Sequence, residues 1–222
     1  MAENSFKNVS TQPKPFFLLP MKTLFLLGGV FSAFFILIAG LVFFDYAHLM
    51  DNAIFNFVRS TPFNSSPILT LILQNIARLG SSQFVLPLSL LVGVFLSLYR
   101  RNLALGVWFV LSVILFEALL ESLKHLLAHS VQWLSHSTNF PSAIALSLTL
   151  FYGLLVLLLP HLITHQIFQN ILSYSLFGLI FLIGLALIVL GVSFSSVLGG
   201  VCLGALGACF SIGIYLSVFQ KI

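Results

Sequence analysis

The chain has 222 residues, of which 59% are hydrophobic and only 6% are charged, whereas an ordinary soluble domain has about 25% charged residues. Such a composition cannot cover a globule with polar groups in water. It therefore excludes a sizeable soluble domain and predicts a membrane protein surrounded by membrane lipids. The net charge is +4, from nine basic and five acidic residues. Because the basic residues flank apolar runs, as membrane topology requires, we expect no nucleic-acid partner.

Residues 1–21 are polar and contain several prolines, which predicts a short cytoplasmic tail. The apolar run at residues 22–44 follows, and about 20 apolar residues suffice to cross a bilayer as a helix. This run is too long for the apolar core of a cleaved signal peptide. We therefore predict a signal anchor that is also the first span of a single membrane domain over residues 22–222.

Residues 45–81 are amphipathic, because polar residues such as Asp51 and Arg59 interrupt the apolar pattern. The first half of this segment has one apolar helical face: Met50, Ile54, Phe57 and Val58. In the second half, one polar stripe consists of Thr70, Gln74 and Arg78. Two short amphipathic helices that lie at the membrane interface or cap the bundle fit this pattern.

Five further apolar segments complete the prediction of an all-α bundle with six transmembrane helices. These segments are residues 82–99, 103–127, 141–159, 172–191 and 196–219. In this topology six basic residues fall on one side of the membrane: Lys7, Lys14, Lys22, Arg100, Arg101 and Lys221. Three fall on the other side: Arg59, Arg78 and Lys124. The positive-inside rule then places both termini in the cytoplasm, and we predict a multi-pass protein of the bacterial inner membrane.

Small residues recur every four positions in the last span, a pattern that lets helix backbones approach closely. They are Ser196, Gly200, Gly204 and Ala208, with Gly199 and Gly207 beside them. Packing inside the bundle is the expected use of this stripe, and a seam between subunits is the alternative. Cys202 and Cys209 lie seven residues apart in the same span, where we expect small packing residues and no disulfide.

Glu117, Glu121 and Lys124 place three charges inside an apolar span, where an ionisable group is costly and often functional. Their i, i+4 and i, i+3 spacing puts them on one face of a helix. The spacing favours an ion pair that neutralises itself, and a role in binding or assembly is the alternative.

Histidines precede the fourth span, but their pattern does not predict a metal site. Only His125 and His129 have i, i+4 spacing, His136 stands apart, and no H-E-x-x-H sequence is present. Since zinc needs three or four ligands, we expect neither a metal nor another cofactor.

The polar loop before the fourth span ends in Asn139-Phe140-Pro141-Ser142-Ala143-Ile144-Ala145. Proline is well tolerated in the first turn of a helix, because its missing N–H would be unpaired there. A polar loop that leads into a buried helix is a position where a membrane enzyme would hold its site.

The layout resembles the type 2 phosphatidic acid phosphatases, also called the lipid phosphate phosphatase superfamily. Its members have six spans and three outward-facing motifs: K-x6-R-P, P-S-G-H and S-R-x5-H-x3-D. The resemblance implies phosphoryl transfer, in which the third motif's His attacks phosphorus and its Asp holds that His. The second motif's His protonates the leaving group, and the Lys and Arg side chains clamp the phosphate.

The chain keeps the frame of these motifs but few of their reactive residues. Lys124 matches the first motif, whereas its Arg falls on Val131. Pro141 and Ser142 match the second motif, whereas its His falls on Ile144. In the third motif the Arg falls on Leu187, the nucleophilic His on Ser193, and the Asp on Val197, or on Ser196 if the turn is one residue shorter.

These replacements predict a catalytically inactive phosphatase-like protein. General acid–base catalysis and electrostatic stabilisation each raise the reaction rate by about 10²-fold or more. The side chains that would supply them are absent here. We expect a structural subunit of a larger inner-membrane assembly, such as a transport or secretion machine, with other membrane proteins as partners. One alternative is a lipid phosphate or polyprenyl diphosphate phosphatase with a rewired site that uses Lys124, Ser193 and His129. The other is a protein that binds a lipid without turnover.

Overall fold

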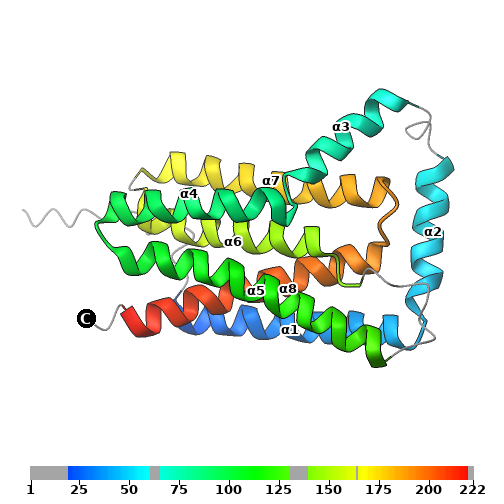
Figure 1. The fold of residues 1–222 in the computed structure, drawn as a ribbon, viewed down its shortest axis with the longest axis horizontal. Coiled ribbons are helices and arrows are strands. Elements are labelled where there is room, and N and C mark those ends of the chain that lie inside the picture. The colour runs from blue at the N-terminus through cyan, green and yellow to red at the C-terminus, as the bar shows by residue number, and fades with distance from the viewer. Residues whose placement is uncertain (1–19, 61–65, 131–139, 164, 220–222) are drawn as a thin grey trace, which may run out of the picture.

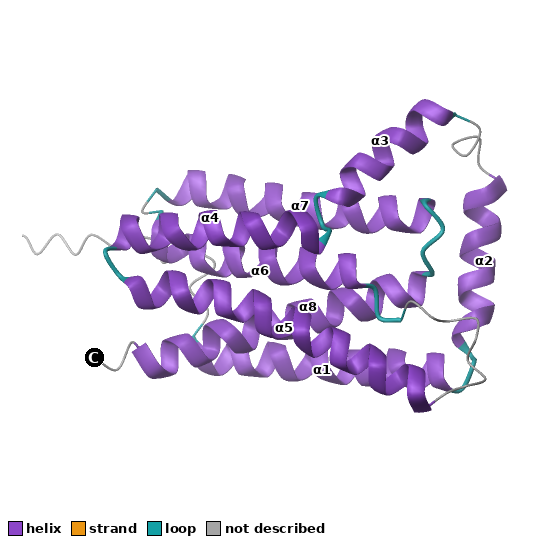
Figure 2. Cartoon of the chain, viewed as in Figure 1, coloured by secondary structure: helices purple, strands orange, loops and turns teal. Residues whose placement is uncertain are grey.

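The computed structural model describes residues 20–60, 66–130, 140–163 and 165–219, and within them every regular element is a helix (Figures 1 and 2). The helices are α1 (Met21–Phe43), α2 (Ala47–Ser60), α3 (Pro67–Arg78), α4 (Ser82–Arg100), α5 (Leu103–Ser130), α6 (Ala143–Leu162), α7 (Gln166–Val189) and α8 (Phe194–Phe219). The predicted tail falls almost wholly outside the described residues.

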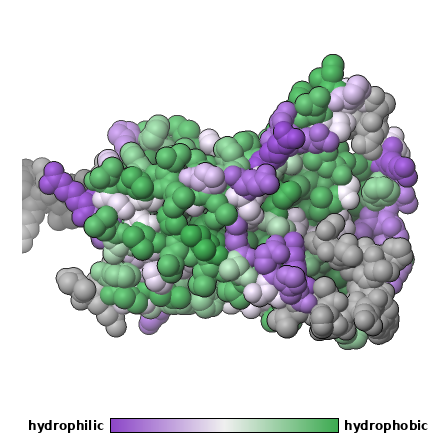
Figure 3. Space-filling model, in the orientation of Figure 1, coloured by the Kyte–Doolittle hydropathy of each residue, from purple (hydrophilic) through white to green (hydrophobic). Residues whose placement is uncertain are grey.

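Six of these helices, α1 and α4 to α8, are long and apolar enough to cross a membrane. They run alternately in opposite directions along the long axis of the bundle (Figure 1). The predicted all-α membrane bundle with six spans is therefore confirmed. Figure 3 shows that the visible side of the bundle is largely hydrophobic, whereas hydrophilic residues gather on the lower part of α3, on α2 and in a patch over α5.

The core of the bundle is built around α6, which packs against α8, α7, α4 and α5. Leu146, Leu148, Leu150, Phe151 and Leu154 of this helix are fully buried. α1 packs mainly along α8 and exposes most of its other side chains. A helix that is apolar all round is expected at the centre of a membrane bundle.

The predicted amphipathic pair is present as α2 and α3. α2 lies across one end of the bundle, which we call the α2 end, and α3 leans away from it at an angle (Figure 1). Ser66 caps α3, because its Oγ accepts the backbone N–H of Leu69 at 3.5 Å, and Pro67 occupies the first turn.

Only part of the predicted apolar face of α2 packs on the bundle. Ile54 and Val58 are half-buried as expected, but Phe57 is 70% exposed and the buried residue is Ala47. The packed face is turned toward Asp51, whose carboxylate makes a tertiary contact described below.

Several helix boundaries differ by a few residues from the predicted spans. The largest difference is at α7, which begins at Gln166 and not at residue 172. Gln169 lies in this additional stretch and is polar, yet it is buried in the bundle. α6 begins at Ala143, because Ser142 is its N-cap and its Oγ accepts the N–H of Ala145 at 3.4 Å.

Candidate functional site

The second and third motif regions, distant in sequence, meet at the α2 end of the bundle. There the start of α6, the end of α7 and the start of α8 lie next to one another (Figure 1). The backbone N–H of Ser142 donates to the backbone carbonyl of Ser196 at 3.0 Å, which joins the second motif directly to the third. Gly191 ends α7 with a φ of +91°, a conformation that glycine adopts without strain.

Aliphatic side chains occupy this meeting point. Leu187, Val197, Ala145 and Ala77 are buried in one apolar cluster, and Ile144 packs against it. Leu187 is only 1% exposed and Val197 only 3% exposed. We call these five residues the apolar cluster. Three of them stand where the superfamily resemblance places an Arg, an Asp and a His, and none of the five can carry a charge or donate a proton.

The serines of the third motif region have different surroundings. Ser193 is exposed, whereas Ser196 is buried. A hydroxyl at position 193 is accessible, but the residue four positions later, which would orient a nucleophile in the superfamily, is the aliphatic Val197. Val131 and Asn139 lie outside the described residues.

A polar contact links three spans close to the apolar cluster. Ser147 of α6 donates its hydroxyl hydrogen to Oε1 of Glu117 on α5 at 2.8 Å. The hydroxyl oxygen of Ser82 at the start of α4 lies 3.5 Å from that of Ser147. A carboxylate inside an apolar span needs such a donor, because leaving it unpaired would be costly.

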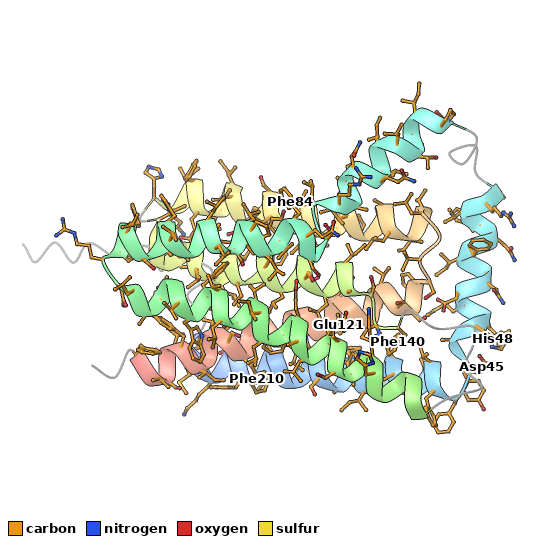
Figure 4. All side chains as sticks on the ribbon, viewed as in Figure 1. Asp45, His48, Phe84, Glu121, Phe140 and Phe210 are labelled. Carbon is orange, nitrogen blue, oxygen red and sulfur yellow. The ribbon has the colours of Figure 1, made fainter. Side chains whose placement is uncertain are left out.

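The predicted ion pair is not formed within the described part of the chain. Glu117 pairs with Ser147, Glu121 is exposed on α5 (Figure 4), and Lys124 is half-buried without an ion-pair contact to either carboxylate. Glu117 and Lys124 share a helical face, but seven residues separate them by about 10.5 Å along the axis. Glu121 is turned toward the exposed side. The alternative role of these charges in binding or assembly stays a prediction.

The sequence did not reveal the contact of Asp51. This α2 carboxylate accepts the backbone N–H of Ser195 at Oδ1 (2.9 Å) and the Ser195 hydroxyl at Oδ2 (2.6 Å). Ser195 lies in the first turn of α8, where backbone N–H groups are unpaired and negative charge is favourable. A serine at a helix start was a visible signal, but nothing local in the sequence connects it to residue 51.

The small residues of α8 are used within the bundle. Gly200 and Gly204 face α6 so closely that an added Cβ would lie 2.5 Å from the carbonyl oxygen of Ser142 and 2.7 Å from that of Leu146, respectively. Gly199 faces the ring of Phe140, which is labelled in Figure 4, and Gly207 faces Phe116 and Leu150. These are the close backbone approaches that small residues permit.

Metal-binding chemistry has little support in the described residues. They contain no group of three or more His, Cys, Asp or Glu side chains that could hold a metal ion. His125 is exposed, and His136 lies outside the described residues, so the expected absence of a metal stays a prediction. Both cysteines are free, and Cys209 is buried.

Comparison with known proteins identifies the fold. No protein-family model and no curated protein sequence matches the chain. Among solved structures, the chain is similar to the first transmembrane PAP2 type phosphatidylglycerolphosphate phosphatase from Bacillus subtilis. The TM-score is 0.71 at 21% sequence identity, and the match covers 88% of this chain and 98% of that chain. The chain is thus a multi-pass membrane protein with the fold of a PAP2-type phosphatase, and the predicted resemblance to this superfamily is confirmed at the level of the fold.

Proposed function

We propose that this protein is a phosphatase-like membrane protein that does not hydrolyse phosphate esters and serves as a structural subunit of a larger membrane assembly. The observation that supports the proposal is the apolar cluster. Leu187, Val197 and Ile144 come from three different helices and pack together at the motif positions. Phosphoryl transfer needs charge stabilisation and proton transfer at that place, and aliphatic side chains supply neither.

The role as a subunit is supported by apolar surface outside the membrane-spanning helices. Leu49 and Phe57 of α2 and Ile68 and Leu71 of α3 are each at least 60% exposed. Large exposed apolar groups commonly mark surfaces that contact a partner or a membrane. The proposed partners are other membrane protein subunits together with lipids, in a bacterial inner membrane and with both termini in the cytoplasm.

Phosphate release from the purified protein tests the absence of catalysis. The substrates are phosphatidic acid, phosphatidylglycerolphosphate and a polyprenyl diphosphate in mixed micelles, and the Bacillus subtilis phosphatase is the positive control. We expect release no faster than in protein-free micelles. The proposal would be refuted by phosphate release, from any of these substrates, that falls tenfold or more in the Lys124→Ala variant. Such a fall would assign turnover to this chain and not to a contaminant.

The subunit role has its own test. Cross-linking in native membranes, followed by purification in mild detergent, is expected to recover the chain with other membrane proteins in reproducible ratio. A species that contains only this chain and lipid would contradict the role and would favour lipid binding without turnover. Reporter fusions at the two termini test the topology, and a periplasmic signal from either fusion would overturn it.

A rewired phosphatase is the second candidate. The fold matches that of a phosphatase over 88% of the chain, Ser193 is exposed, and Lys124 is half-buried on α5. A serine nucleophile and a phosphate-binding lysine would be the minimum for phosphoryl transfer. If phosphate is released, Ser193→Ala and Lys124→Ala should each abolish it. Release that persists in both variants would exclude this version of the site.

A further inference from the structure

Few buried side chains attach α2 to the rest of the protein. It contacts the ends of α1, α7 and α8, yet the only buried residue in this helix is Ala47. Leu49 and Phe57 are 66% and 70% exposed. Because tertiary burial supplies most of the stability of a short helix, α2 must depend on other contacts to keep its place.

The carboxylate of Asp51 supplies such a contact. It receives two hydrogen bonds from one residue, the N–H of Ser195 at 2.9 Å and the hydroxyl of Ser195 at 2.6 Å. Both bonds are charge-assisted, which makes them stronger than bonds between neutral groups. The N-terminus of α8 adds a favourable field for the negative charge. The contact joins residues 144 positions apart in the chain.

The turn before α2 is tight and closed by backbone hydrogen bonds. Asp45 has a φ of +61°, in the left-handed region, and the backbone N–H of Tyr46 still bonds to the carbonyl of Leu41 at 2.9 Å. Figure 4 shows Asp45 and His48 together at this turn, where His48 Nδ1 lies 3.7 Å from Asp45 Oδ2. This exposed i, i+3 pair holds the turn itself and contributes little to the docking of the helix.

We propose that α2 is a hinged strap, and that the Asp51–Ser195 contact is the latch that holds it across the first turn of α8. This turn carries Ser195 and Ser196, which are both buried, beside the apolar cluster. When the latch is closed, the strap covers that turn. When the latch is open, α2 swings about residues 44–46 and uncovers it. The inference does not depend on whether the protein hydrolyses phosphate.

Hydrogen exchange of the full chain in lipid nanodiscs tests the latch. Asp51→Ala removes both charge-assisted bonds and is expected to speed exchange of the α2 amides by about tenfold or more. Ser195→Ala removes only the hydroxyl bond, because the backbone N–H still donates to Asp51, and should speed this exchange by a smaller factor. Exchange in the core of α6 should be unchanged. Asn52→Ala is the matched control, since Asn52 is the exposed neighbour of Asp51 on the same helix, and it should leave α2 as slow as in the wild type.

A disulfide provides the opposite perturbation. Asp51→Cys with Ser195→Cys, in a chain with Cys202→Ala and Cys209→Ala, should cross-link on oxidation and slow α2 exchange below that of the reduced form. α2 exchange in Asp51→Ala that equals the Asn52→Ala control would overturn the proposal. Faster exchange in every helix of Asp51→Ala would also overturn it, because Asp51 would then stabilise the whole fold and not a strap.

Discussion

A close approach between α6 and α8 depends on the absence of a side chain at Gly204. A Cβ there would lie 2.7 Å from the carbonyl oxygen of Leu146, 2.9 Å from Cβ of Thr149 and 3.0 Å from the backbone nitrogen of Leu150. Two of these atoms belong to the backbone of α6 and cannot rotate away. Gly204→Ala must therefore push the two central helices apart.

The magnitude follows from two opposing effects. Overpacking a close-packed site lowers the free energy of unfolding by about 1–3 kcal/mol. The higher helix propensity of alanine relative to glycine raises it by about 0.8–1.0 kcal/mol. We expect a net destabilisation of about 0–2 kcal/mol. For a chain of this length, about 2–4 °C per kcal/mol gives a fall in Tm of up to about 8 °C, measured by thermal unfolding in detergent.

Gly178→Ala on α7 is the matched control. Its added Cβ would meet no atom within 4 Å, so only the gain in helix propensity remains and Tm should stay constant or rise. The packing argument would be refuted if Gly204→Ala were as stable as Gly178→Ala, because α6 and α8 would then be able to separate without loss.

Three further substitutions test the buried contacts by the same unfolding measurement. Val197→Asp should lower the free energy of unfolding by about 3 kcal/mol or more, because it buries a charge among aliphatic groups. A Val197→Asp variant as stable as Val197→Ala would show that water reaches the cluster. Ser147→Ala should cost about 1–3 kcal/mol, because Glu117 loses its donor; no loss would mean that the carboxylate finds another partner. Trp108→Phe should cost about 0.5–1.5 kcal/mol, because Nε1 donates to the carbonyl of Ser211 at 2.9 Å; a stability gain would contradict that contact.

The transmembrane architecture was predictable because its cause is local. An apolar run of about 20 residues must form a helix in lipid, where every backbone group has to be paired within the segment. The same logic located α2 and α3, since amphipathic helices carry their period in the sequence. It failed at the start of α7, where Gln169 is polar yet buried, because hydropathy alone cannot distinguish a buried polar helix turn from a loop.

The contacts at the α2 end were less predictable because they join distant segments. The i, i+3 and i, i+4 spacing favoured an ion pair within α5, but Glu117 faces a serine of α6 instead. The Asp51–Ser195 contact has no local pattern at all. By contrast, the superfamily resemblance pointed to positions 144, 187 and 197 (or 196), and Ile144, Leu187 and Val197 pack together in the structure.

The apolar cluster also restricts how any activity could arise in this protein. A single charged residue introduced at Leu187 or Val197 would be buried without a partner, and such a charge is strongly destabilising. A charged pair could be tolerated only if its members entered together with the hydrogen bonds that satisfy them. The present side chains avoid this cost because all five residues of the apolar cluster are apolar. Catalysis, if it occurs, must therefore use groups outside the cluster, such as Ser193, and the decisive comparison is phosphate release with and without that hydroxyl.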